Sequence, residues 1–149
     1  MICSFIENQD IGFYKNIYKN YYCKKTILTF DNINVKFYVD NFEHAFYKNT
    51  DRKLLDKSLF SYDRANRIYW IKWVLENPKA DLYIGYNSNT KNYDNSRRVA
   101  VCVDDYAVII SIDKKDKTKA KFITAYLANE TNGKGDKAID LIKKGPKWK

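Results

Sequence analysis

The chain has 149 residues, of which 45% are hydrophobic, and it holds only five glycines and two prolines. It can therefore bury the core of one domain (residues 1–149), and the composition argues against extensive disorder. Its net charge of +9 and its pI near 9.3 favour a polyanionic partner, although A/T-rich codons would also enrich lysine.

No run of eighteen apolar residues occurs, so the sequence predicts no membrane span and no membrane partner. Residues 1–7 lack the basic and apolar stretches of a signal peptide. We therefore expect a cytoplasmic protein, either of the producing cell or of a target cell into which other machinery carries it.

The first 48 residues contain three predicted elements. Residues 1–22 predict a short amphipathic helix from near-helical spacing of Phe13, Ile17, Tyr18, Tyr21 and Tyr22. Two β-prone runs, 26–30 and 35–39, are separated by an Asp/Asn turn and predict a hairpin. Residues 40–48 then predict a helix capped by Asp40 or Asn41. On that helix His44 and Lys48 are four residues apart and would share a face.

The clearest helix begins near Ser61 or Asp63 and is ended by Asn77-Pro78. Its core stripe is predicted to consist of Ile68, Ile71 and Leu75. Arg64 and Arg67 lie one turn earlier, beside that stripe, which is an unusual position for arginines that only need solvent.

The second half of the chain predicts a sheet. Residues 81–95 resemble a loop with one short strand, and an antiparallel meander follows, formed by 98–103, 106–112 and 121–127. A short basic helix is expected at 137–144. The fold class is therefore α+β, with N-terminal helices packed on a small four- to five-stranded antiparallel sheet and a core within residues 26–128.

The sequence indicates neither a metal nor a cofactor. The three cysteines, Cys3, Cys23 and Cys102, have no metal-ligand spacing and form no disulfide framework, so buried reduced thiols are expected. Asp104-Asp105 and the pair Asp113/Asp116 occupy predicted turns, where solvated carboxylates are common.

RNA cleavage by the substrate's own 2′-hydroxyl needs a base, an acid and cations around the phosphorane. His44, the single histidine, is the candidate base because histidine titrates nearest to neutral pH. The alternative is that His44 is a structural or surface residue. Lys48 could stabilise charge or could be a solvated helix lysine.

Two arginines and two tryptophans are further candidates for contacts with RNA. Arg64 and Arg67 could clamp the scissile phosphate, or they could pair with acids such as Asp63 or Asp40. Trp70 and Trp73 could stack on unpaired bases, but at this spacing they are more often part of a core.

Alternation along the last strand predicts that Phe122, Thr124 and Tyr126 share one face and that Ile123, Ala125 and Leu127 occupy the other. Thr124 and Tyr126 would then line a cleft, where Tyr126 could donate a proton or stack on a base. The alternative is a half-exposed amphipathic strand. Among the other cations, we expect Lys48, Arg98 and Lys121 to contact the substrate.

Three short motifs occur in a fixed order: Phe42-Glu43-His44-Ala45-Phe46, then Arg64-Ala65-Asn66-Arg67-Ile68 with Trp70-Ile71 and Leu75-Glu76-Asn77-Pro78, then Phe122-Ile123-Thr124-Ala125-Tyr126. Over residues 26–128 this order resembles the phage-associated and toxin branch of the barnase/EndoU/colicin/RelE-like ribonucleases. The resemblance implies helices before a small antiparallel sheet that forms the cleft. It also implies metal-independent cleavage of cellular RNA, often tRNA.

Carried over, the resemblance makes His44 the acid/base, Arg64 or Arg67 the phosphate-binding cation, and Thr124 and Tyr126 cleft residues. Many relatives carry a second histidine, which is missing here, so the proton partner would be Tyr126, Lys48 or another residue.

The hypothesis from the sequence is a metal-independent endoribonuclease that acts as a toxin or phage effector. Two alternatives stay open: a non-catalytic RNA- or ribosome-binding module, and an interaction or inhibitor protein. A toxin would also need an inhibitor in the producing cell, and an acidic immunity or antitoxin protein would suit the basic surface.

Overall fold

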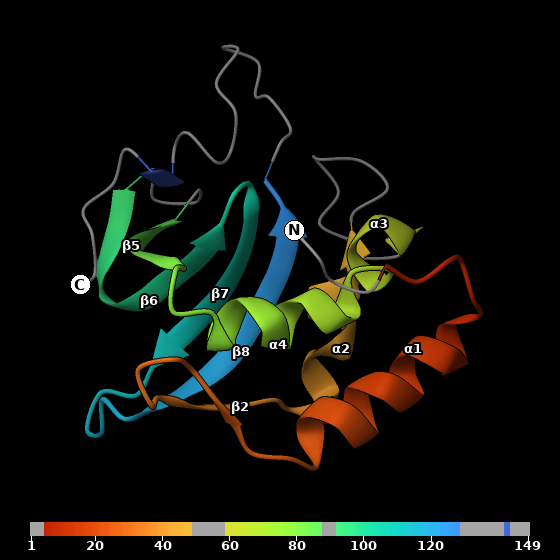
Figure 1. The fold of residues 1–149 in the computed structure, drawn as a ribbon, viewed down its shortest axis with the longest axis horizontal. Helices are drawn as coiled ribbons and strands as arrows, with labels where there is room; N and C mark the ends of the chain where they lie inside the picture. The colour runs from red at the N-terminus through yellow and green to blue at the C-terminus, as the bar shows by residue number, and fades with distance from the viewer. Residues whose placement is uncertain (1–4, 49–58, 88–91, 129–141, 144–149) are drawn as a thin grey trace.

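A computed structural model describes residues 5–48, 59–87, 92–128 and 142–143 (Figure 1). Its main sheet has six strands in the order β1-β2-β8-β7-β6-β5. The strands are β1 (Ile27–Leu28), β2 (Asn34–Lys36), β5 (Asp81–Asn87), β6 (Asn92–Val103), β7 (Tyr106–Ile112) and β8 (Lys119–Leu127). The α+β class is confirmed, because helices pack on this sheet.

The sheet is larger than predicted and is not purely antiparallel. The β1–β2 hairpin and the β6–β7–β8 meander form as expected, but β2 pairs with β8 in parallel and joins the two units. Val35 of β2 lies opposite Ala120 of β8, and both side chains are buried in the same core, which fixes this register. Residues 81–95, predicted to be a loop with one short strand, contain β5 and the first residues of β6, which pair with each other.

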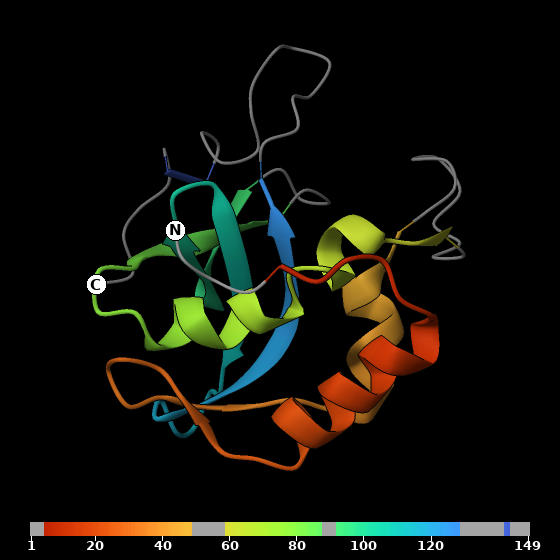
Figure 2. The ribbon, with the colours of Figure 1, turned by 45° about the vertical axis from the view of Figure 1, so that its right-hand side comes forward.

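The two faces of the sheet bury different clusters. The main core lies under the helices and includes Val101, Val108, Ile110 and Phe122. Helix α4 (Ile68–Glu76) runs across this face in both ribbon views (Figures 1 and 2) and buries the predicted stripe of Ile68, Ile71 and Leu75, together with Val74. On the opposite face a smaller cluster gathers around Ala100, Cys102 and Ala107, with Ile142 packed against it.

The N-terminal segment is helical but changes its winding. Helix α1 (Ile11–Ile17) begins at Asp10, whose carboxylate accepts the N–H of Phe13, and it continues as the π-helical η1 (Tyr18–Cys23). Tyr14, Tyr18 and Tyr22 form its buried face and contact the rings of the main core. The three tyrosines are four residues apart, a spacing that keeps them on one side of the helical segment.

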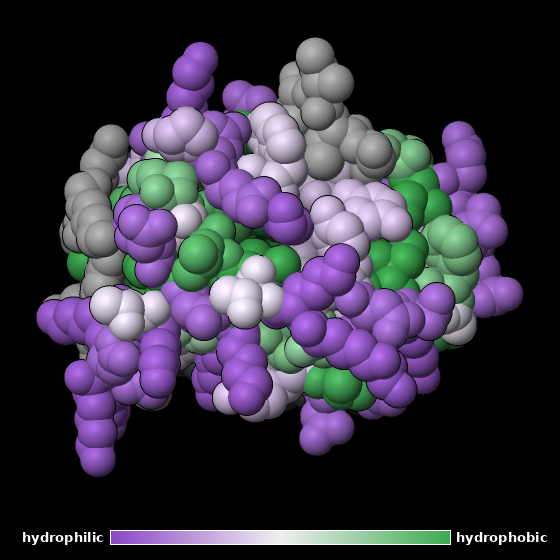
Figure 3. Space-filling model, turned by 60° about the horizontal axis from the view of Figure 1, so that its bottom comes forward, coloured by the Kyte–Doolittle hydropathy of each residue, from purple (hydrophilic) through white to green (hydrophobic). Residues whose placement is uncertain are grey.

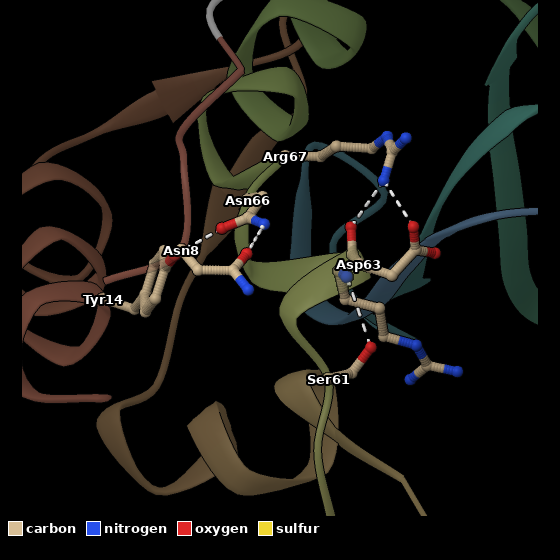
Figure 4. A network of polar contacts seen from close by, with 7 residues as sticks. Asn8, Tyr14, Ser61, Asp63, Asn66 and Arg67 are labelled. Carbon is tan, nitrogen blue, oxygen red and sulfur yellow. Dashed lines mark hydrogen bonds and ion pairs between the residues drawn. The ribbon is translucent and has the colours of Figure 1, made fainter. Parts of the chain in front are cut away.

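The helix predicted from Ser61 to Leu75 is broken. Helix α3 (Tyr62–Ala65) begins at the Ser61 cap, and α4 follows after a break at Asn66 and Arg67. The side chain of Asn66 accepts the hydroxyl proton of Tyr14 and donates to Asn8 (Figure 4). These bonds to the N-terminal segment hold Asn66 in place at the junction of the two helices.

The helix predicted for residues 40–48 is much shorter. The 3-10 turn η2 (Val39–Asn41) leads into α2 (Phe42–Phe46), and the chain then extends into β3 (Tyr47–Lys48), which pairs with β4 (Leu59–Phe60). The prediction that His44 and Lys48 share a helix face is therefore wrong. The helix ends because Phe46 turns its carbonyl to the N–H of Ser61, 2.8 Å away, and strand pairing takes over.

Within the described ranges, no helix is both long enough and apolar enough to cross a bilayer. Of the expected basic helix at 137–144, only Ile142 and Lys143 belong to the described residues, and these two are helical.

Candidate active site

Helix α2 presents His44 to solvent. The apolar residues Phe42, Ala45 and Phe46 recur at helical spacing and are buried, which leaves Glu43 and His44 on the exposed side of the helix. The helix packs beside α3 and the C-terminal half of β8 (Figures 1 and 2). His44 is therefore exposed on the side of α2 that faces away from the core.

Asn41 fastens the start of α2 to β8. Its side-chain amide donates to the carbonyls of Phe122 at 3.1 Å and Ile123 at 2.8 Å. Asn41 occupies the predicted capping position, but its side chain makes no capping bond to the helix. It binds the strand edge beyond the point where β2 stops pairing with β8, at Lys36 and Lys121.

These carbonyls belong to a β-bulge. Ile109 pairs with Thr124 and Ile110 pairs with Phe122, so Ile123 is an extra residue in β8. Asn41 therefore donates to two consecutive carbonyls at the bulge. A regular neighbouring strand could not donate to both of them, because its ladder does not pair with consecutive carbonyls on one edge. The sequence did not reveal this role, because an asparagine just before a helix is typical of a helix cap.

The bulge corrects the predicted faces of β8. Phe122 enters the main core together with Ala125, whereas Ile123 and Tyr126 pack against the smaller cluster on the opposite face. The prediction that Phe122 shares a face with Tyr126 is wrong, because the extra residue shifts the alternation by one. Thr124 follows the same alternation as Tyr126 beyond the bulge.

Arg64 links α2 to β8. Ser61 accepts the N–H of Arg64 at the start of α3, which sets the direction of this short helix. The guanidinium donates to the carbonyl of Ala45, 3.4 Å away, and its carbon lies 5.5 Å from the centre of the Tyr126 ring. Ala45 directly follows His44, so one cation contacts both elements that carry the predicted acid and base.

Thr124 and Tyr126 are both half-buried, and Tyr126 is the one whose ring lies beside this cation. The hydroxyl oxygen of Thr124 is buried and has no hydrogen-bond partner within the part of the chain that the structure describes. A buried hydroxyl without a partner costs free energy, so Thr124 is an unsatisfied polar group within the described part of β8.

Arg67 lies in a different environment from Arg64. Its guanidinium donates to the carboxylate and carbonyl of Asp63, both at 2.7 Å (Figure 4), and stacks on the rings of Trp70 and Phe5. The break between α3 and α4 separates the two arginines, since it places Arg64 on one helix and Arg67 at the start of the next. The ion pair with Asp63, which the sequence offered as the alternative, is present at Arg67.

The other predicted contacts are spread over the sheet. Lys121 is exposed on β8, opposite Lys36 of β2 and Ser111 of β7. The backbone of Arg98 pairs with Ser111 in β6, while the side chains of Arg98 and Lys48 lie outside the described part of the structure. Trp73 and Trp70 are half-buried against the main core, and Trp70 contacts Tyr106.

A groove beside Lys121 does not include His44 among its lining residues. It has a volume of about 640 Å³ and lies at the β1–β2 end of the sheet, where five exposed lysines line it: Lys24, Lys25, Lys36, Lys119 and Lys121. Figure 3 views this end, and hydrophilic side chains dominate it. Lys119 and Lys121, at alternate positions of β8, are a sequence signal for it, but the parallel pairing that brings Lys36 of β2 beside them was not predicted.

Among the described residues, no three His, Cys, Asp or Glu side chains come together as a metal site. Cys23 and Cys102 form no disulfide, and Cys3 lies outside the described residues. Cys102 is buried as expected, and burial raises the pKa of its thiol to about 12. Cys23 is only half-buried, and desolvation raises its pKa as well.

No family model, curated protein or solved structure matches the chain. The resemblance to the barnase/EndoU/colicin/RelE-like ribonucleases therefore stays a prediction based on the three motifs.

Proposed function

We propose that this chain is a metal-independent endoribonuclease that acts as a toxin or phage effector. The substrate's 2′-hydroxyl would attack the adjacent phosphorus, so the protein must supply proton transfer and positive charge rather than a nucleophile. The residue types gathered around α2, α3 and β8 fit this requirement: an imidazole, a guanidinium, a phenol and a hydroxyl.

The observation that carries the proposal is the position of Arg64. Its guanidinium contacts the carbonyl of the residue after His44 and faces the Tyr126 ring, which comes from a segment more than eighty residues away from α2. A guanidinium at this junction can stabilise the charge of a phosphorane between the two side chains. The Arg67 guanidinium instead pairs with Asp63 and packs on the rings of Trp70 and Phe5.

In the proposed step His44 accepts the proton of the 2′-hydroxyl while the 2′-oxygen bonds to phosphorus. The bond between phosphorus and the 5′-oxygen of the next nucleotide breaks, and Tyr126 gives its proton to that oxygen. The products are a 2′,3′-cyclic phosphate and a 5′-hydroxyl. A proton from His44, passed through solvent, restores the Tyr126 phenol, so the enzyme ends in its starting state.

The test uses purified protein and total RNA in excess EDTA, with the ends of the products mapped. We expect cleavage that leaves 2′,3′-cyclic phosphate ends, and we expect its loss in His44→Ala. The matched control is Glu43→Ala, which removes the neighbouring exposed side chain on α2. Intact RNA in EDTA with cleavage only after magnesium is added would contradict the proposal, as would equal cleavage by His44→Ala and wild type.

A second candidate function is an RNA-binding module without chemistry. The observation that favours it is the lysine-lined groove, which lies away from His44. This function predicts that His44→Ala binds RNA as tightly as wild type and that neither protein cleaves it.

A further inference from the structure

We propose that the lysine-lined groove binds an unpaired stretch of RNA next to the cleaved phosphate. The groove is defined here by Lys24, Lys25, Lys36, Lys119, Lys121 and Tyr38, all of which are exposed. The inference rests on the proposed function for the identity of the polyanion, but its test measures binding and is separate from the test of cleavage.

The charge of the groove points to a polyanion. Five lysines surround it, and the single acidic side chain among its described lining residues is Asp113. The Asp113 carboxylate accepts the backbone N–H groups of Lys115 and Asp116, so it is occupied within its own turn. Lysines that neutralise phosphates release condensed counterions, which gives affinity without regard to sequence.

The aromatic ring in the groove points to unpaired bases. Tyr38 is 48% exposed, and the Lys36 ammonium lies 5.2 Å from the centre of its ring. An exposed ring beside cations can stack on a base while the lysines contact the flanking phosphates. Bases within a duplex are stacked on each other and do not offer their faces to a side chain. A ring surrounded by lysines therefore favours a single strand.

Two chain segments lead from the groove to the candidate active site. The first runs from Lys36 through Asn41 to His44, and the second runs along β8 from Lys121 to Tyr126. Pairing holds them together at Lys36 and Lys121, and Asn41 ties them again at the bulge. Five residues of strand span roughly 16 Å, a distance that a few nucleotides of extended RNA can cover.

The experiment measures binding of a fluorescent 2′-O-methyl RNA 12-mer by anisotropy at several salt concentrations. This oligomer lacks the attacking hydroxyl and stays intact whether or not the protein is an enzyme. The variants are Lys36→Gln/Lys121→Gln, Tyr38→Ala and Tyr38→Phe. The control is Lys15→Gln/Lys79→Gln, which removes the same charge from exposed positions outside the groove.

We expect Lys36→Gln/Lys121→Gln to weaken binding about tenfold at low salt and to reduce the salt slope by about 1.4. Tyr38→Ala should weaken binding about tenfold, whereas Tyr38→Phe should keep it. Equal affinities of the groove variants and the lysine control would overturn the assignment. A duplex that binds as tightly as the single strand would overturn the preference for unpaired RNA.

The two proposals fail separately. If the groove variants bind like wild type while His44→Ala abolishes cleavage in EDTA, the groove assignment is wrong and the ribonuclease stands. If the groove variants lose binding while wild type cleaves no RNA, the groove assignment stands and the protein is a binding module.

Discussion

The guanidinium carbon of Arg64 lies 5.5 Å from the centre of the Tyr126 ring, and this contact joins helix α3 to strand β8. If Arg64 stabilises the phosphorane, Arg64→Ala should lower the single-turnover cleavage rate about 100- to 1000-fold. Arg64→Lys should recover part of the rate, since it keeps the charge but loses the planar fork. The measurement is the cleavage of a labelled RNA in EDTA.

The matched control is Arg67→Ala, four positions from the Asp63 carboxylate that holds the wild-type side chain. Its loss of the ion pair and of ring stacking should lower the free energy of unfolding and leave the cleavage rate within a few-fold of wild type. A larger effect of Arg67→Ala than of Arg64→Ala would show that Arg67, and not Arg64, makes the phosphate contact.

Asn41 provides a test of how α2 is positioned. Asn41→Ala leaves the carbonyls of Phe122 and Ile123 without their amide donor, so the free energy of unfolding should fall by about 1 to 3 kcal/mol. The cleavage rate should fall too, because α2 carries His44. Denaturant unfolding and kinetics at a temperature where both proteins are folded separate the two effects. Unchanged cleavage by a destabilised variant would show that the tether is only structural.

Local signals predicted much of the fold. The Ser61 cap and the Asn77-Pro78 stop bound the helical region, and Asp104 makes the turn between β6 and β7 with a positive φ of 53°. Each of these features depends on the conformational preferences of a few adjacent residues, which the sequence displays directly.

The features that were missed depend on distant partners. At the bulge, Ile123 binds the side chain of Asn41, more than eighty residues earlier, and at the helix break Asn66 binds the N-terminal segment. The parallel pairing of β2 with β8 likewise joins segments that no local pattern connects. For the site, alternation along β8 was read without the bulge, and so Phe122 was placed on the wrong face.

The bond from Tyr14 to Asn66 should contribute to stability. Tyr14→Phe removes the hydroxyl that donates to the buried Asn66 side chain and accepts from the N–H of Gln9. We expect a loss of about 1 to 3 kcal/mol in the free energy of unfolding, because a buried acceptor is left unpaired. Tyr62→Phe is the control, since Tyr62 packs on the same ring but is exposed. Equal losses in both variants would show that the bond contributes little.

The buried thiol of Cys102 should make the free energy of unfolding fall as the pH rises in the alkaline range. Burial raises its folded pKa to about 12 from an ordinary value of 9.0, while the nearby Lys143 lowers this pKa and Asp81 raises it. Between these two values the unfolded chain loses the thiol proton and the folded chain keeps it, so unfolding becomes more favourable as pH rises. Below about pH 8 both states hold the proton, and the effect vanishes.

Wild type should therefore lose about 1 kcal/mol of stability relative to Cys102→Ala between pH 8 and pH 10. The measurement is denaturant unfolding of both proteins at each pH. Subtracting one free energy of unfolding from the other cancels the titration of the tyrosines and lysines that the two proteins share. Cys23→Ala, at a half-buried thiol, should show a smaller change. A difference between wild type and Cys102→Ala that stays constant with pH would mean that the Cys102 thiol ionises as easily in the folded chain as in the unfolded one.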